Sequence, residues 1–99
     1  MSRFNLQAGD DALYLGGELD FDNAAEALAS VITHIESQGD LTIDLAGVSK
    51  SNSAGLALMI EWLARASKAG HAIQYRNVPE GLMELARVSQ VDELIAAGN

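Results

Sequence analysis

The sequence predicts an α/β fold built around a small mixed β-sheet, and three observations support this. Strand-like and helix-like segments alternate along most of the 99 residues. The first two strand-like segments are separated only by a short turn, whereas the later ones are separated by amphipathic segments of helical length. A short turn joins antiparallel strands and a helical crossover joins parallel ones, so the sheet should contain both kinds of pairing.

An antiparallel hairpin is expected at the N-terminus. RFNLQ, residues 3–7, and ALYLGGEL, residues 12–19, have the pattern of two strands, with Gly9 and Asp10 in the turn. Gly16 and Gly17 lie inside the second strand, where glycine indicates a bulge or a close approach of another backbone.

A first helix is predicted after the hairpin, with Asn23 able to cap its start and Gly39 able to end it. Its apolar residues have the spacing of one helical face and are Ala24, Leu28, Val31 and Ile35. A short buried strand over residues 41–46 should follow, with Asp44 on the face opposite its apolar side chains.

A second helix is predicted in SNSAGLALMIEW, residues 51–62, and the segment after it. Ser53 is expected to be its N-cap and Gly70 its left-handed C-terminal cap. One stripe of the helix should face the core, made of Leu56, Met59, Ile60 and Leu63. The rest of the chain reads as a strand over residues 71–77, a helix over 79–88 that Pro79 opens, and a short helix over 91–98.

Leu58 and Trp62 lie on a different face of the second predicted helix from the core stripe. Two interpretations are open. The two side chains pack against a neighbouring helix, or Trp62 is an exposed anchor at an interface with another protein.

Composition excludes several classes of protein. Ninety-nine residues suit a single domain over residues 1–99, and one proline leaves little room for a linker. Six Lys and Arg against fourteen Asp and Glu give a net charge of −8, which disfavours binding to nucleic acid or to anionic membranes. The chain has no cysteine, which excludes disulfides and thiolate chemistry. It has no apolar N-terminal segment and no stretch that approaches a membrane span, so a cytoplasmic location is expected.

Catalytic and metal-binding patterns are absent from the sequence. It contains no phosphate-binding loop, no dinucleotide fingerprint and no nucleophile elbow, and His34 and His71 have no partner at metal-ligand spacing. The carboxylates of Glu18, Asp20 and Asp22 allow a divalent cation, but acids at this place also complement the positive end of the following helix. We therefore expect no enzyme, no metal and no cofactor.

The hydroxyl of Ser53 has two interpretations. As an N-cap it accepts a backbone N–H bond, which is worth about 1 kcal/mol. The same position stabilises added negative charge, so Ser53 is also a candidate phosphoacceptor. Gly55, two residues later, leaves room for the backbone of another protein to approach.

Three segments in order resemble STAS domains, the module of sulphate transporters and anti-sigma factor antagonists. GELDFDNAAEAL, residues 17–28, is similar to the family's G-E-L-D segment, and NSAGLALM, residues 52–59, is similar to its D-S-S-G-L segment. The ending VPEGLMELARVSQVDELI, residues 78–95, resembles the family's closing helix and terminus.

The resemblance implies a STAS-like fold, in which helices pack mainly on one face of the small mixed sheet, and no catalytic activity. In the antagonist branch the serine matching Ser53 is phosphorylated by a partner kinase, and Asp20 matches an acid near that serine. Here Asn52 replaces the acid before the phosphoacceptor and Ala54 follows it, which departs from the pattern of that branch.

The segment NSAGLALMIEWLARASKAG, residues 52–70, looks more like the MlaB branch, the STAS subunits of Mla phospholipid-transport ABC complexes. That resemblance implies binding to the cytoplasmic ATPase subunit, which would hold the chain at the inner membrane. The alternatives are an anti-sigma factor antagonist with a kinase partner and, with less support, a small-ligand or nucleotide binder. The expected partner surface comprises Ser53, Asn52, Ala54, Gly55, Leu58, Trp62 and Asp20.

Overall fold

The computed structural model describes residues 4–97, so the ends of the predicted 1–99 domain lie outside it. Its elements follow the predicted order. They are β1 (Phe4–Ala8), β2 (Leu13–Leu19), α1 (Ala24–Gln38), β3 (Leu41–Ser51), α2 (Ser53–Lys68), β4 (Ile73–Arg76), α3 (Glu80–Val88) and α4 (Asp92–Ala97).

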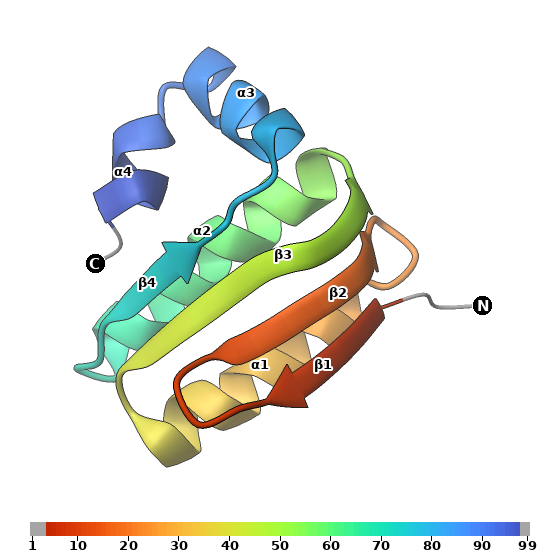
Figure 1. The fold of residues 1–99 in the computed structure, drawn as a ribbon. Coiled ribbons are helices and arrows are strands. Elements are labelled where there is room, and N and C mark those ends of the chain that lie inside the picture. The colour runs from red at the N-terminus through yellow and green to blue at the C-terminus, as the bar shows by residue number, and fades with distance from the viewer. Residues whose placement is uncertain (1–3, 98–99) are drawn as a thin grey trace.

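The strands form a mixed sheet in the order β1-β2-β3-β4. The hairpin pair β1 and β2 is antiparallel, and β2 with β3 and β3 with β4 are parallel. Figure 1 shows α1 and α2 against one face of this sheet, with α3 near the start of α2 and α4 beside β4. The predicted α/β class, the mixed pairing and the placement of the helices on one face are confirmed.

The core lies between the sheet and the two helices α1 and α2. Alternate residues of the central strands point into it, as the period of a strand requires. The buried side chains that meet there include Leu13, Leu15, Leu19, Ile43, Leu45 and Ile73 from the strands, and Val31, Ile35, Met59 and Leu63 from the helices. The predicted core stripe of α2 is confirmed, with Ile60 only partly buried.

The pairing of β2 with β3 is irregular at the two glycines of β2. The pairing of β2 with β3 shifts register between Tyr14 and Gly16 and again between Gly17 and Glu18. Gly17 has a φ of 83°, a backbone conformation that other residues rarely adopt. The irregularity expected at these glycines is present, but the extra residues lie on β3, where three steps from Asp44 to Gly47 oppose two from Tyr14 to Gly16.

Strand β3 continues to Ser51, beyond the predicted end at residue 46. The residues of β3 beyond residue 46 pair with the part of β2 that follows the first register shift, Gly17 with Val48 and Leu19 with Ser51. The exposed residues Ser49 and Lys50 hid this continuation in the sequence, because they interrupt the apolar pattern.

Polar side chains from three adjacent strands meet across the sheet. Tyr14, Asp44 and Arg76 are direct register neighbours on β2, β3 and β4. The Nε of Arg76 donates to Asp44 Oδ2 at 2.8 Å, and its guanidinium carbon lies 5.9 Å from the centre of the Tyr14 ring. The Tyr14 hydroxyl in turn donates to Asp11 Oδ1 at 2.7 Å. This network ties β2, β3 and β4 together.

Burial of Asp44 raises the pKa of its carboxyl, but hydrogen bonds outweigh that effect. The backbone N–H of Ala46 and the side chains of Arg76 and Asn77 all donate to the carboxylate. The pKa of Asp44 consequently lies below its usual range.

In the part of the chain that the structure describes, no helix is long and apolar enough to cross a bilayer.

Candidate partner-binding site

Asn52, not Ser53, caps the start of α2. Asn52 is extended, with a φ of −137°, and its Oδ1 accepts the backbone N–H of Ala54 at 2.9 Å. Ser53 is the first helical residue, so the prediction that it is the N-cap was wrong by one position. Asparagine and serine both suit an N-cap, which is why the pattern S-N-S did not decide between them.

The hydroxyl of Ser53 is exposed, and no described residue forms a hydrogen bond with it. It lies in the first turn of a 16-residue helix, where N–H groups lack intrahelical partners and negative charge is stabilised. The capping role of Asn52 leaves this hydroxyl available to another molecule.

The loop from β2 to α1 leaves the sheet beside the start of α2. Leu19, the last residue of β2, is the register neighbour of Ser51, and its carbonyl accepts the N–H of Asn52 at 3.3 Å. The two connections therefore lie at the same end of the sheet, as Figure 1 shows for the β2–α1 and β3–α2 turns. Asp20 follows directly after Leu19, so the structure brings its loop next to the start of α2.

Asp20 and Asn23 organise that loop through side-chain hydrogen bonds. Asp20 Oδ1 accepts the backbone N–H groups of Asp22 and Asn23, at 3.0 and 3.1 Å. The buried Asn23 side chain accepts the N–H of Asp20 and donates to the Glu18 carbonyl. Asn23 holds the N-cap position of α1 as predicted. Its side chain, however, forms hydrogen bonds within the preceding loop and not with the N–H groups of the helix.

Leu58 and Trp62 are buried between the helices. Leu58 is 5% exposed and Trp62 is 0% exposed, and the indole Nε1 donates to the Leu28 carbonyl of α1 at 3.4 Å. The structure decides for helix packing, so the interpretation of Trp62 as an exposed anchor was wrong. A helix that faces both a sheet and a neighbouring helix needs two apolar stripes, and a single sequence does not show which neighbour covers the second.

Gly55 and Ala54 are also buried, which corrects the expectation that Gly55 leaves room for a partner backbone. A Cβ on Gly55 would lie 3.3 Å from Leu82 Cδ2 and 3.4 Å from Leu19 Cβ. The absence of a side chain at Gly55 thus lets α3 and β2 of the same chain pack closely against α2.

An apolar hollow of about 260 Å³ opens between the first halves of α1 and α2. It is lined by Phe21, Ala24, Leu28, Ala54, Ala57, Leu58 and Glu61. Phe21 is 72% exposed, which is unusual for a large aromatic side chain. Ser53 is not among the lining residues, but it directly precedes Ala54 and lies one helical turn before Ala57, which both line the hollow.

Phe21 and Ala57 were missed by the sequence analysis. A signal for Phe21 was present, since it is a lone aromatic residue between two acids in a predicted loop, outside any apolar pattern. Ala57 had no such signal, because its small side chain acquires a role only from the space left between the helices.

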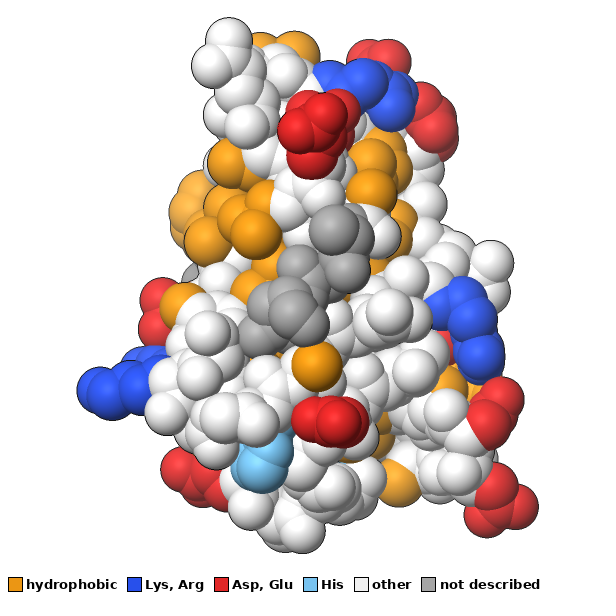
Figure 2. All heavy atoms as spheres, turned by 90° about the vertical axis from the view of Figure 1, so that its left-hand side faces the viewer, with side chains coloured by type: hydrophobic (Ala, Val, Ile, Leu, Met, Phe, Trp, Pro, Cys, Tyr) orange, Lys and Arg blue, Asp and Glu red, His pale blue; other side chains and the backbone are white. Residues whose placement is uncertain are grey.

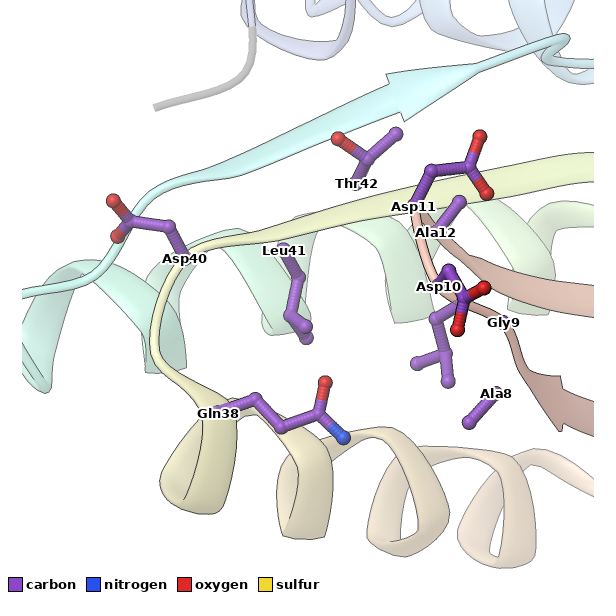
Figure 3. A pocket seen from close by; sticks show the side chains of 10 residues that line it. Ala8, Gly9, Asp10, Asp11, Ala12, Gln38, Asp40, Leu41 and Thr42 are labelled. Carbon is purple, nitrogen blue, oxygen red and sulfur yellow. The ribbon is translucent and has the colours of Figure 1, made fainter.

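A second hollow lies at the opposite end of the sheet, below the β1–β2 turn (Figure 3). Its volume is about 110 Å³, and Asp10, Asp11 and Asp40 are among the residues that line it. Asp11 accepts the Tyr14 hydroxyl, and Asp40 accepts the backbone N–H of Ala72 at 2.8 Å. Among residues 4–97 no group of three His, Cys, Asp or Glu side chains is arranged to hold a metal ion.

Hydrophobic side chains are also exposed on the last two helices. Figure 2 shows them in the upper part of the molecule, over α3 and α4, next to a group of charged residues. Val88 is 83% and Leu94 is 43% exposed. This area is separate from the hollow beside Ser53.

Comparison with protein-family models identifies the family. A model described as "Mlab, STAS domain" matches residues 2–96. The chain belongs to the STAS domain family. The resemblance of the GELD and NSAGLALM segments to STAS domains, and to the MlaB branch, is confirmed by this match. STAS domains are in general non-catalytic modules of protein interaction.

Solved STAS structures share the fold. Unphosphorylated SpoIIAA, an anti-sigma factor antagonist, has a TM-score of 0.70 and 16% identity, with 91% of this chain and 83% of that chain covered. A putative anti-sigma factor antagonist from Thermotoga maritima has a TM-score of 0.74 and 20% identity, with 94% and 83% covered. The search of curated proteins returned no match. Identities this low establish the fold only.

Proposed function

We propose that this STAS domain is a non-catalytic subunit of a phospholipid-transport ABC complex of the Mla type. It binds the cytoplasmic ATPase subunit and stabilises or activates it, and so sits at the inner membrane through its partner. The complex as a whole moves lipid between membranes and maintains outer-membrane asymmetry, while this chain contacts neither nucleotide nor lipid.

One observation carries the proposal, which is that the exposed Ser53 hydroxyl directly precedes the residues of α2 that line the apolar hollow. A polar group beside an apolar recess is the usual composition of an interface core and its edge. Phe21 is already exposed at that recess, so a partner that covers it removes apolar surface from water. The MlaB-type family match supports an ABC ATPase as this partner.

The net charge of −8 supports a protein partner over a lipid or nucleic-acid one. Phospholipid surfaces in bacteria and nucleic-acid backbones are both anionic, and each would be repelled. A protein surface can instead complement the acidic field locally.

Affinity purification of the tagged chain from its native cells, with mass spectrometry of the proteins recovered, tests the proposal. Recovery of an ABC ATPase together with its membrane permease is the expected result. Recovery of a small protein kinase without these subunits would overturn it.

A second candidate function, an anti-sigma factor antagonist controlled by phosphorylation of Ser53, is favoured by the same exposed hydroxyl. A phosphate there would lie at the positive end of the α2 dipole, where Asn52 already accepts the N–H groups of Ala54 and Gly55. Asn52 supplies no carboxylate beside it, unlike the D-S-S-G-L pattern. Intact-mass measurement of the chain from native cells, before and after phosphatase treatment, distinguishes the two, because a loss of one phosphate mapped to Ser53 is expected only for the antagonist.

A further inference from the structure

The hollow beside Ser53 is followed along α1 and α2 by another hollow, and we call the two together the α1–α2 groove. This other hollow, the third in the molecule described, has a volume of about 500 Å³ and is lined by Ile32, Ile35, Glu36, Arg65, Lys68 and Ala69. The two hollows are lined by successive members of the same side-chain rows. On α1 the row is Ala24, Leu28, Ile32 and Glu36, and on α2 it is Ala54, Ala57, Leu58, Glu61, Arg65 and Lys68.

The groove follows the helix axes. Residues four apart on α1 and three or four apart on α2 lie above one another on one face of each helix. Between Ala54 and Lys68, α2 rises about 20 Å at 1.5 Å per residue. Figure 1 shows the two helices lying side by side on the sheet along this length.

The chemistry of the groove changes along its length. The end near Ser53 is apolar, and Glu61 is the charged residue that lines it. The other end holds two of the six Lys and Arg of the chain, Arg65 and Lys68, together with one acid, Glu36. Arg65 is paired with Glu61 at 2.8 Å, whereas Lys68 has no ion pair with any described residue.

We infer that this groove seats one amphipathic helix of the partner, with apolar side chains over Ala57 and Leu58 and an acidic side chain facing Lys68. The inference rests on the proposed function, since it specifies which part of the ATPase subunit binds. The acidic charge follows from complementarity, because Lys68 is an unpaired cation in a strongly acidic chain.

A helix suits the groove better than an extended segment. The walls are side chains of two helices, which offer no unpaired backbone groups along their length. An extended peptide would leave its own N–H and C=O groups without a ladder, whereas a helix satisfies them internally. Rows spaced three and four residues apart also match the ridges of a third helix.

Charge reversal tests the inference with the purified chain and the purified ATPase subunit. Lys68→Glu should weaken binding about tenfold or more, because it places a glutamate opposite the acidic side chain of the partner helix. Arg87→Glu is the matched control, because it makes the same charge change on the surface of α3, and it should leave affinity within about twofold. The Lys68→Glu effect should shrink at high salt.

A photo-crosslinking residue in place of Ala57 then identifies the bound segment. The crosslinked ATPase peptide should have apolar residues spaced three and four apart and an acidic residue beyond them. Reversing that acid to lysine should restore the affinity lost in Lys68→Glu.

Each result decides one claim. Binding by the wild type with Lys68→Glu no weaker than Arg87→Glu would overturn the groove inference and leave the proposed function standing. Crosslinking of Ala57 to lipid, or to an ATPase segment without the apolar spacing, would do the same. Failure of the wild-type chain to bind the ATPase subunit would overturn the proposed function and the inference together.

Discussion

The side chain of Asn52 accepts the backbone N–H of Ala54 at 2.9 Å, so α2 is capped without the help of Ser53. Asn52→Ala should therefore lower the free energy of unfolding by about 1 kcal/mol. Ser53→Ala should change it by less than about 0.5 kcal/mol, as for an exposed surface position. Urea unfolding of both variants checks this, and a larger loss for Ser53→Ala would contradict the assignment of the cap.

Trp62 joins α1 to α2, and its side chain is fully buried. Trp62→Ala should cost about 3–5 kcal/mol of unfolding free energy, because it leaves a large cavity between the helices. Leu94→Ala, at a residue 43% exposed, is the control and should cost less than about 1 kcal/mol. Chemical unfolding followed by circular dichroism measures both variants. Equal losses of unfolding free energy would contradict the packing of Trp62 between α1 and α2.

Two helical glycines should respond differently to alanine. A Cβ on Gly81 of α3 meets nothing within 4 Å, so Gly81→Ala should raise the unfolding free energy by about 0.4–1 kcal/mol. A Cβ on Gly55 is crowded by Leu82 at 3.3 Å, so Gly55→Ala should gain less or lose stability. Thermal unfolding compares them, and a greater gain at Gly55 would refute the tight contact of α2 with α3.

The Asp44 network predicts a dependence of stability on pH. The folded pKa of Asp44 lies below its usual range, so its ionised form stabilises the fold at pH values above the ordinary carboxyl range, near 4. That stabilisation is lost as the pH falls through the lowered pKa. Asp44→Asn should thus be less stable than the wild type at pH 7, and the difference should narrow below about pH 4. Urea unfolding midpoints of the wild type and Asp44→Asn across this pH range measure the difference in stability. A difference that widens in acid would contradict the lowered pKa of Asp44.

The order and type of the elements could be predicted because hydrophobic period and turn residues are local signals. The φ of 81° at Gly70 agrees with the predicted left-handed end of α2. The boundary errors also have local causes. Ser53 and Asn52 are both good caps, and Ser49 and Lys50 concealed the second half of β3, whose pairing with β2 is irregular.

The candidate site was predicted less completely, because burial depends on neighbours that lie far apart in the sequence. Leu58 and Trp62 have the spacing of a helical face, but only the position of Leu28, more than thirty residues earlier, shows that this face is covered. Phe21 and Ala57 form the recess only when the β2–α1 loop and α2 come together at one end of the sheet.

The most direct test of the partner-binding site is the affinity of the purified chain for the ABC ATPase subunit, compared between Ser53→Glu and Ser67→Glu. Both serines are exposed on α2, but Ser67 lies at the end of the helix opposite to Ser53, away from the hollow that Ala54 and Ala57 line. A glutamate at the start of α2 suits the helix dipole, so the fold should be retained. The account predicts that Ser53→Glu abolishes binding with an unchanged unfolding midpoint while Ser67→Glu binds normally. Wild-type affinity in Ser53→Glu would contradict it.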